Sequence, residues 1–381
     1  MNKFFNLKIV AITHFISRSG TLYLHSLLDN HPQIATIPGT IDIVKILKIK
    51  KRLSALECYE IFKENNPKFF DTSSFNFSDR NNSSLWILGD DKKKKILTNE
   101  NEFKSNFLLA LENREITPRN ILISLYFAYA KVHNKKIENF KIILMHPHEK
   151  KTTLIFNKFF NDAIYLVPIR NPIKAYKSIL IKTKFVNKLR GLKYYPSGQL
   201  MESALDIKDF YLNKLDMYFL KLEDLNNNLE HFMQKISKLL KIDFNRMMLS
   251  STFGGLKYWG NSVEKQTNNF DNKGFKEQVD LPKNDLKIIY FLNSQLMNIL
   301  NYKRIKLTTF EKITLPISFL FPLKDEIDFL TNTKKINFQN LFKFIVFFFP
   351  KRAKLLLTVF LNNYSSRYSY LAKRLIKNQL N

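Results

Sequence analysis

The chain has one cysteine, Cys58, among its 381 residues, so an internal disulfide bond is excluded. A single thiol also excludes a metal site built from several thiolates. Such low cysteine usage fits a reducing compartment, and we therefore expect the protein in the cytoplasm.

Long apolar stretches are missing too, because no run approaches the roughly 18 residues that a membrane-spanning helix requires. Residues 1–12 carry an early lysine and turn apolar, as a signal peptide does. Lys8 interrupts the run, however, and no small-residue cleavage site follows. We expect this segment to be structural, and the protein to be at most peripheral at a membrane.

Acidic residues are scarce relative to basic ones: 33 Asp and Glu against 61 Lys and Arg give a formal net charge of +28. This charge favours anionic partners, namely nucleotides, anionic glycans or anionic lipid surfaces. A chain-wide bias towards Lys, Asn, Ile and Phe explains part of it, so the charge alone decides little. A hydrophobic content of 45% argues against disorder.

Glycine is scarce as well, and Gly20 is the first of nine. It stands in a loop between an apolar run, 9–16, that predicts a buried parallel strand and a helical pattern from Leu22 that stops at 29–32. Strand, loop and helix aim backbone N–H groups and a helix dipole at one point, which suits a phosphate or sulfate. The Gly-Lys-Ser/Thr ending of a Walker A loop is missing, which argues against a nucleotide triphosphatase.

Two further strands are predicted over 140–145 and 163–169. In open α/β sheets the ligand lies beyond the carboxyl ends of the strands. We therefore expect His146 and His148, which follow the first of these strands, on the same sheet edge as Arg18.

The second of these strands leads into a predicted helix. Asn171 is typical of a helix cap and Pro172 of a first helical turn. Arg170 accordingly stands at the strand-to-helix corner, also on that edge, and Ser178 lies further along the helix.

Residues 18–21, Arg-Ser-Gly-Thr, followed by His-Pro at 31–32, resemble the 5′-phosphosulfate loop of the sulfotransferase superfamily. Two positions depart from the family pattern. Ser17 stands where the family usually has proline, and Leu22 stands where it usually has a second threonine.

The stretch 160–178 resembles the 3′-phosphate signature of the same superfamily: a phenylalanine, an Asp-Ala pair, an apolar strand, then Arg170, a proline two residues on and Ser178 eight residues on. The stretch 252–262 resembles the late Gly-x-x-Trp-x-Gly-Asn-Ser loop of bacterial members, at a different spacing. Two motifs in the family's order favour this interpretation over an ordinary βα unit with a surface arginine.

The resemblance implies a P-loop-NTPase-like, three-layer α/β domain with a central parallel sheet flanked by helices. It implies sulfuryl transfer from 3′-phosphoadenosine 5′-phosphosulfate (PAPS) to a hydroxyl or amine, without a metal. Arg18 would be catalytic, by stabilising charge on the leaving phosphate oxygen, and Tyr23 would contact adenine unless it packs in the core. The donor-binding residues implied are Arg18, Ser19, Gly20, Thr21, Leu22, Tyr23, Arg170, Ser178, Lys257 and Gly260.

The general base has three candidates. Asp42 is the first, because it is the nearest carboxylate downstream of the loop helix. His146 and His148 follow, since imidazole titrates near neutrality and both are expected at the strand edge. Each of the three also has a structural role as its alternative.

We expect an α/β domain over 1–304, with a helical insert at about 41–135, and a basic, Phe-rich, mainly helical extension over 305–381. Within the extension, 353–375 has one apolar helical face flanked by Lys and Arg. Such a helix binds an anionic membrane surface or a partner, or packs back on the domain.

The acceptor favoured here is a glycan or glycolipid, with no nucleic acid as partner. The alternatives are a sulfotransferase for a small molecule or protein tyrosine, and a non-catalytic basic protein that binds nucleic acid or anionic membrane.

Overall fold

The computed structural model describes residues 1–14, 16–49, 53–72, 88–180, 213–260, 281–303, 305–321, 323–324 and single positions between 327 and 375. The end of the late loop, 261–262, lies outside the described residues. So does most of the helix predicted over 353–375.

A five-stranded sheet forms the centre of the molecule, with every neighbouring pair of strands parallel, in the order β2-β3-β1-β4-β5. The strands are β1 (Lys8–Thr13), β2 (Ile34–Thr36), β3 (Ile142–His148), β4 (Ile164–Ile169) and β5 (Asp216–Lys221). The central strand, β1, therefore has β3 on one side and β4 on the other. The predicted α/β class with a parallel sheet is confirmed.

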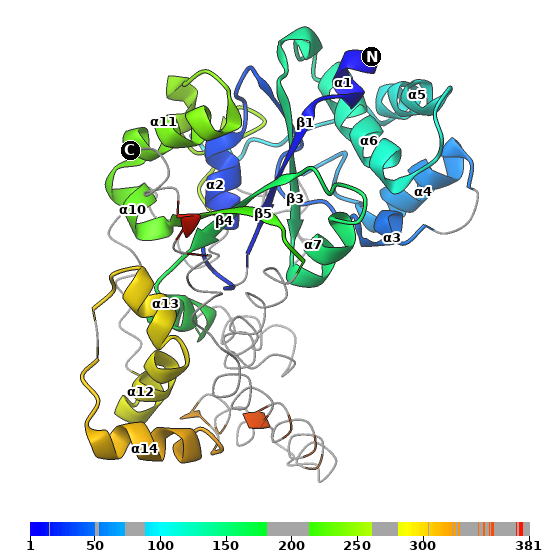
Figure 1. Cartoon of the computed structure of the whole chain (residues 1–381). Coiled ribbons are helices and arrows are strands. Elements are labelled where there is room, and N and C mark those ends of the chain that lie inside the picture. Colours follow the sequence, from blue (N-terminus) through cyan, green and yellow to red (C-terminus); the bar gives the residue numbers. More distant parts are fainter. Residues whose placement is uncertain are drawn as a thin grey trace.

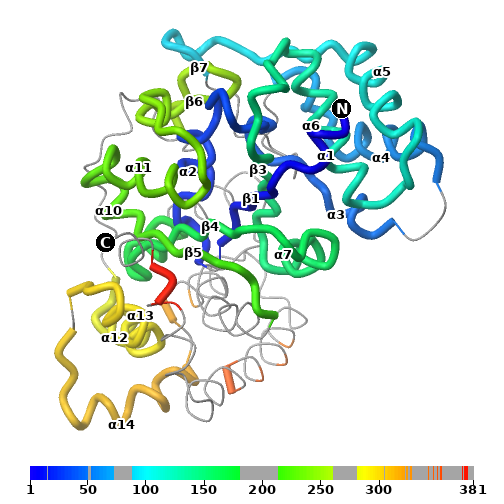
Figure 2. Tube along the Cα trace, turned by 45° about the horizontal axis from the view of Figure 1, so that its top comes forward, coloured from blue at the N-terminus to red at the C-terminus, as the bar shows by residue number. Residues whose placement is uncertain are grey.

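Helices cover both faces of this sheet, because alternate residues of each strand point to opposite sides. Val10 and Ile12 of β1 pack with Leu24, while Ile9 and Ala11 belong to the cluster on the other face. One layer holds α2 (Thr21–Leu28), α10 (Leu222–Asn227) and α11 (Leu229–Leu240) (Figure 1). The other holds α1 (Asn2–Phe5), α3 (Val44–Leu47), α4 (Ala55–Asn65), α5 (Glu100–Leu111), α6 (Pro118–Val132) and α7 (Lys150–Phe156) (Figure 2).

Helix ends follow the capping residues. The Thr117 hydroxyl accepts a bond from the Asn120 N–H, and α6 begins with Pro118 in its first turn. The helical insert expected over about 41–135 begins with two separate helices, α3 and α4. Ser54, in extended backbone, forms a reciprocal capping box with Glu57, which starts a new helix there.

Two short helices follow one another near the end of the expected α/β domain, α12 (Lys283–Leu292) and α13 (Ser294–Ile299). The other described elements are η1 (Ile137–Asn139), η2 (Arg246–Leu249), β6 (Thr252–Phe253), β7 (Leu256–Lys257) and α14 (Thr309–Ser318), and residues 172–180 are helical.

Part of the predicted C-terminal extension packs back on the sheet. The Phe219 N–H of β5 donates to the Arg374 carbonyl (2.9 Å). Leu371 and Leu375 belong to the same buried cluster as Phe219. These residues therefore extend the α/β core. Further upstream, α14 packs against α12 through Leu315.

The β6–β7 hairpin is attached to the end of α2 by a buried carboxylate, Asp29. Its Oδ2 accepts bonds from the Gly255 N–H (3.2 Å) and the Thr252 hydroxyl (3.3 Å). Burial nevertheless raises the pKa of Asp29 to about 7. Between about pH 4 and 7 the native state consequently binds this proton more tightly than the unfolded state does, and stability falls as the pH rises through that window.

We predict that Asp29→Asn stabilises the protein at pH 8 relative to the wild type, by a few kcal/mol at most, and that this gain shrinks towards pH 5. The amide oxygen still accepts both hydrogen bonds but does not ionise. Urea unfolding at pH 5, 6, 7 and 8 measures the difference.

Asp162→Asn is the matched control, because the bond from Arg119 lowers the pKa of Asp162. Removing that carboxylate costs stability at neutral pH instead. Parallel stability curves for the wild type and Asp29→Asn from pH 5 to 8 would refute the assignment.

Candidate functional site

The loop between β1 and α2 turns sharply before the N-terminus of α2. Arg18 and Gly20 both have left-handed backbone, at φ 64° and 89°. Gly20 precedes the helix, and a Cβ placed on it would lie 2.8 Å from Leu222 Cδ1. Left-handed residues alternating with ordinary ones turn successive N–H groups inward, which is the geometry of an anion-binding nest.

The N-terminus of α2 receives no side-chain cap from the described residues. The buried Ser19 hydroxyl donates to the Ile16 carbonyl within the loop, and Thr21 is buried in the first turn. Leu22 packs against a small cluster that includes Phe253 of the hairpin. The first N–H groups of α2 are thus the donors that this end of the helix offers to an anion.

Three residues that are distant in sequence meet beside this loop. The Arg18 Nε donates to the Ser178 Oγ (3.2 Å), and the Arg170 guanidinium donates to the Arg18 carbonyl (3.4 Å). The Asn171 side chain caps the helical residues that carry Ser178, by accepting from the Ile173 N–H (2.9 Å). The two predicted motifs, more than 150 residues apart, therefore lie on one site.

Two half-buried guanidinium groups that lie close enough to repel each other are electrostatically costly. Burial lowers the pKa of Arg18, and the neighbouring Arg170 charge lowers it further. Burial also lowers the pKa of Arg170, although Glu223 opposes that shift. Glu223 binds the Asn171 N–H (3.1 Å) and the Tyr302 hydroxyl (2.5 Å). An anion of two or more charges placed here would relieve the repulsion.

The other side of the β1 terminus carries His146 and His148. The β1–β3 register changes between Ala11 and Thr13, so that β3 contains one extra residue before His148. Pro147 lies in this bulge, where its missing N–H is tolerated. His148 has φ 62° and is partly exposed, whereas His146 is buried. The bulge therefore turns two histidines, which a regular strand would project on the same face, into different environments.

A series of hydrogen bonds leads from these two imidazoles into the core. His148 Nδ1 lies 3.2 Å from His146 Nε2, and His146 Nδ1 lies 3.2 Å from His25 Nδ1. His25 Nε2 in turn lies 2.8 Å from the Thr36 Oγ1. Burial lowers the pKa of His25 to about 3, and burial with the neighbouring histidines lowers the pKa of His146 well below its ordinary value. The His14 ring packs edge-on against His148.

Asp42 has a structural role. Its carboxylate accepts the Val44 N–H (2.9 Å) at the start of α3, and its backbone N–H donates to the Asn66 side chain (2.7 Å). The hydrogen bonds described for Asp42 join it to neither arginine and to none of the histidines. Its contacts support the structural alternative over the general base.

The remaining predicted donor residues are placed around α2. Tyr23 packs with the cluster on the α2 face of the sheet. Lys257 is exposed, pairs with Asp90 (3.6 Å) and lies over the Trp259 ring, so it holds the hairpin in this structure. Gly260 is buried with φ 91°.

The sequence did not identify Tyr258 and His25. Tyr258 is 3% exposed and lies close enough to Arg18 to oppose the lowering of its pKa. It stands in the late loop, whose resemblance directed attention to Lys257 instead. His25 lies on the Leu-rich face of α2, and its contact with β3 depends on the tertiary fold.

Across the described parts of the chain, no group of His, Cys, Asp and Glu side chains is arranged to hold a metal ion. The histidines are bonded to one another instead of converging on a common point. No described helix is long and apolar enough to cross a membrane.

We predict that Gly20→Ala destabilises the protein by about 1–2 kcal/mol, because alanine resists this backbone conformation and its Cβ meets Leu222. Urea unfolding measures the loss. In a Leu222→Ala background the clash is removed and the backbone strain stays, so the loss should shrink without vanishing. Equal stability of Gly20→Ala and the wild type would contradict the observed loop geometry.

No family model and no curated protein matches the chain. Solved structures similar to it are the sulfotransferase domain of the Synechococcus PCC 7002 olefin synthase (14% identity, 84% of this chain and 96% of that one, TM-score 0.37) and the sulfotransferase domain of the curacin biosynthetic pathway (16%, 78% and 99%, 0.43). Sulfotransferase STF9 from Mycobacterium avium is also similar (12%, 78% and 78%, 0.39). These TM-scores are below 0.5, so what the site does has to be inferred from its own residues.

Proposed function

We propose that this chain is a sulfotransferase that moves the sulfuryl group of PAPS to a hydroxyl or amine. The observation that supports the proposal most is the meeting of Arg18, Arg170 and Ser178, which two separate motifs predicted. The N-terminus of α2 and Arg18 suit a 5′-phosphosulfate group. Arg170 and Ser178 suit a 3′-phosphate, because a guanidinium fork and a hydroxyl form charge-assisted bonds to a dianion.

The residues of the site would contribute mainly position and charge. Sulfuryl transfer needs the acceptor and the sulfur in line, and stabilisation of the negative charge that develops on the leaving phosphate oxygen. Arg18 and the N–H groups of residues 20–22 are suited to that stabilisation. Their backbone is already turned inward by the left-handed Gly20, so no reorganisation is needed during the reaction.

His148 is the residue best suited to remove the acceptor's proton. It is partly exposed at the carboxyl end of β3, whereas His146 is buried and has both ring nitrogens in hydrogen bonds. Asp42 is engaged at the start of α3. A general base has to reach the acceptor hydroxyl, and this requirement favours the more exposed imidazole.

The decisive experiment is calorimetry with adenosine 3′,5′-bisphosphate, the desulfated donor product, compared with AMP, which lacks the 3′-phosphate. We predict that the wild type prefers the bisphosphate and that Arg170→Ala lowers this preference by ~10- to 100-fold, the value of one or two charge-assisted contacts.

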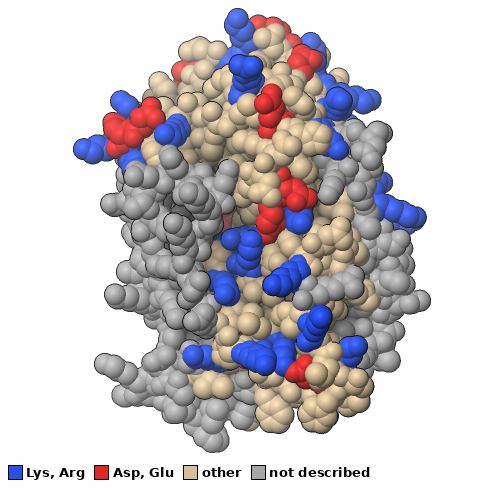
Figure 3. Space-filling view, turned by 90° about the vertical axis from the view of Figure 1, so that its left-hand side faces the viewer, with Lys and Arg blue, Asp and Glu red and all other residues tan. Residues whose placement is uncertain are grey.

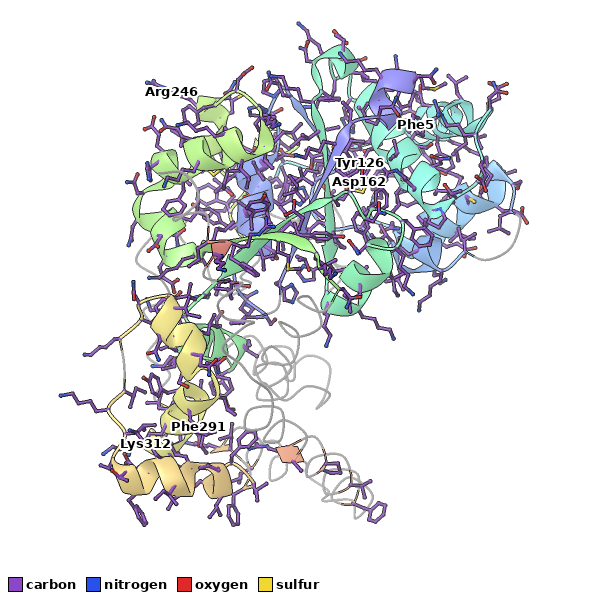
Figure 4. All side chains as sticks on the ribbon, in the orientation of Figure 1. Phe5, Tyr126, Asp162, Arg246, Phe291 and Lys312 are labelled. Atoms are coloured by element: carbon purple, nitrogen blue, oxygen red, sulfur yellow. The ribbon has the colours of Figure 1, made fainter. Side chains whose placement is uncertain are left out.

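Arg246→Ala is the matched control, because it removes one exposed positive charge from η2 (Figure 4), and no described hydrogen bond joins Arg246 to Arg18, Arg170 or Ser178. It should leave the preference unchanged. If the wild type binds neither nucleotide, or binds both equally, the alternative of a non-catalytic basic protein gains and the donor assignment fails.

The acceptor we propose is a glycan or glycolipid. The net charge of +28 supports an anionic or membrane-associated acceptor better than a neutral small molecule. Radiolabelled PAPS with a panel of glycans, glycolipids, phenols and tyrosine peptides would distinguish this acceptor class from the small-molecule and protein-tyrosine alternatives.

A peripheral membrane location is supported by α14. Three of its apolar side chains recur along one exposed face, and they are Phe310 (74% exposed), Ile313 (66%) and Ile317 (60%). Phe321, three residues beyond the end of the helix, is also exposed (65%). Exposed lysines lie near them at 303, 306, 312 and 324. Basic side chains gather over this end of the molecule (Figure 3). Apolar side chains bordered by lysines suit the interface of an anionic bilayer.

We predict that vesicles of phosphatidylserine and phosphatidylcholine bind the protein in a flotation assay. Ile313→Asp with Ile317→Asp should lower binding about tenfold or more, since each aspartate replaces an inserted apolar group by a charge.

Leu109→Asp is the control, because Leu109 is 53% exposed on α5, in another part of the molecule. Binding that is unchanged in the double variant would reject the α14 surface. Equal binding to pure phosphatidylcholine would reject the role of the lysines.

A further inference from the structure

Three imidazoles and one hydroxyl form a single hydrogen-bonded chain from the sheet edge into the core: His148, His146, His25 and Thr36. His146 and His25 each use both ring nitrogens in the chain. Their low pKa values keep both rings neutral near pH 7, so each carries one proton and one lone pair. Under this condition the chain has two proton orders, and they run in opposite directions.

In the inward order each ring donates towards Thr36. His148 Nδ1–H donates to His146 Nε2, His146 Nδ1–H donates to His25 Nδ1, and His25 Nε2–H donates to the Thr36 oxygen. His148 then carries its lone pair on Nε2, on the far side of the ring from the chain. In the outward order Thr36 donates to His25, every bond is reversed, and His148 carries a proton on Nε2.

The Thr36 hydroxyl decides between the two orders, because it has one proton. That oxygen also has the Ile37 carbonyl within 3.4 Å, and a carbonyl only accepts. A hydroxyl that donates to Ile37 has to accept from His25. The inward order thus satisfies every group of the chain, whereas the outward order leaves the Ile37 contact without a donor.

We infer that Thr36, His25 and His146 are positioning residues that hold His148 as its Nδ1–H tautomer, in which Nε2, the ring nitrogen outside this chain, carries the lone pair. The tautomer itself is independent of what the protein does. Its consequence for catalysis rests on the proposed function, in which His148 is the base.

The proton transfer balances within this arrangement. The acceptor's O–H bond breaks, an Nε2–H bond forms, and His148 becomes an imidazolium whose Nδ1–H stays bonded to His146 Nε2. An imidazolium donates from both nitrogens, so the inward order suits the product of this step as well as its reactant. Among the described residues, the titratable groups that contact His148 include His146 of β3 and His14, which directly follows β1. His146 and His25 are too weakly basic to take the proton on.

The test is nitrogen NMR of the full chain with ¹⁵N-labelled histidine, with the His148 signals assigned through His148→Asn. We expect the Nδ1–H tautomer of His148 to predominate in the wild type. Thr36→Val keeps the shape of the side chain and removes its oxygen, so it should shift His148 towards a mixture of tautomers. Thr36→Ser keeps the hydroxyl and should restore the wild-type signals.

An Nε2–H tautomer in the wild type, or signals that Thr36→Val leaves unchanged, would overturn the inference. If the chain is a sulfotransferase, Thr36→Val should also lower kcat about tenfold or more with little change in the KM for PAPS, and Thr36→Ser should recover most of it. Failure of bisphosphate binding would count against the proposed function and leave the tautomer result standing. An Nε2–H tautomer of His148 would overturn the inference and leave the proposed function standing.

Discussion

The repulsion between Arg18 and Arg170 is the constraint on which the site depends. Arg170 donates to the Arg18 carbonyl and Arg18 donates to Ser178, so two half-buried positive groups lie beside each other where the paired strands β1 and β4 end. Protein tolerates such a pair when a multiply charged anion completes it. The left-handed loop and the uncapped helix next to it provide further donors for the same anion.

The strand order gives the site two sides. Because β1 lies between β3 and β4, the loop after it has histidines on one flank and Arg170 on the other. The β4 flank suits phosphate recognition and the β3 flank suits proton transfer. Sulfuryl transfer needs both kinds of group around one point, and a central strand followed by an anion-binding loop brings them there with few residues.

Local signals in the sequence were enough to predict the parallel α/β fold and the meeting of Arg18 with Arg170. Asn171 and Pro172 fix a helix start by contacts within four residues, so the sequence alone located it. The histidine chain could not be predicted from the sequence. His25 and His146 are 121 residues apart, and their contact depends on the register of β3 and on the bulge at Pro147. Asp42 became a base candidate through its proximity in sequence to the loop helix, and that proximity does not reveal its capping bond to Val44.

A chain of neutral imidazoles is better suited to orient His148 here than a carboxylate would be. A buried aspartate behind the imidazole would fix the same tautomer, but it would add a negative charge close to the proposed donor, which already carries several. It would also have to be desolvated within the layer between α2 and β3, where His25 is fully buried. Neutral imidazoles avoid both costs. They still supply the directional bond that sets the tautomer, so the histidine chain follows from the same electrostatics that place two arginines on the other flank.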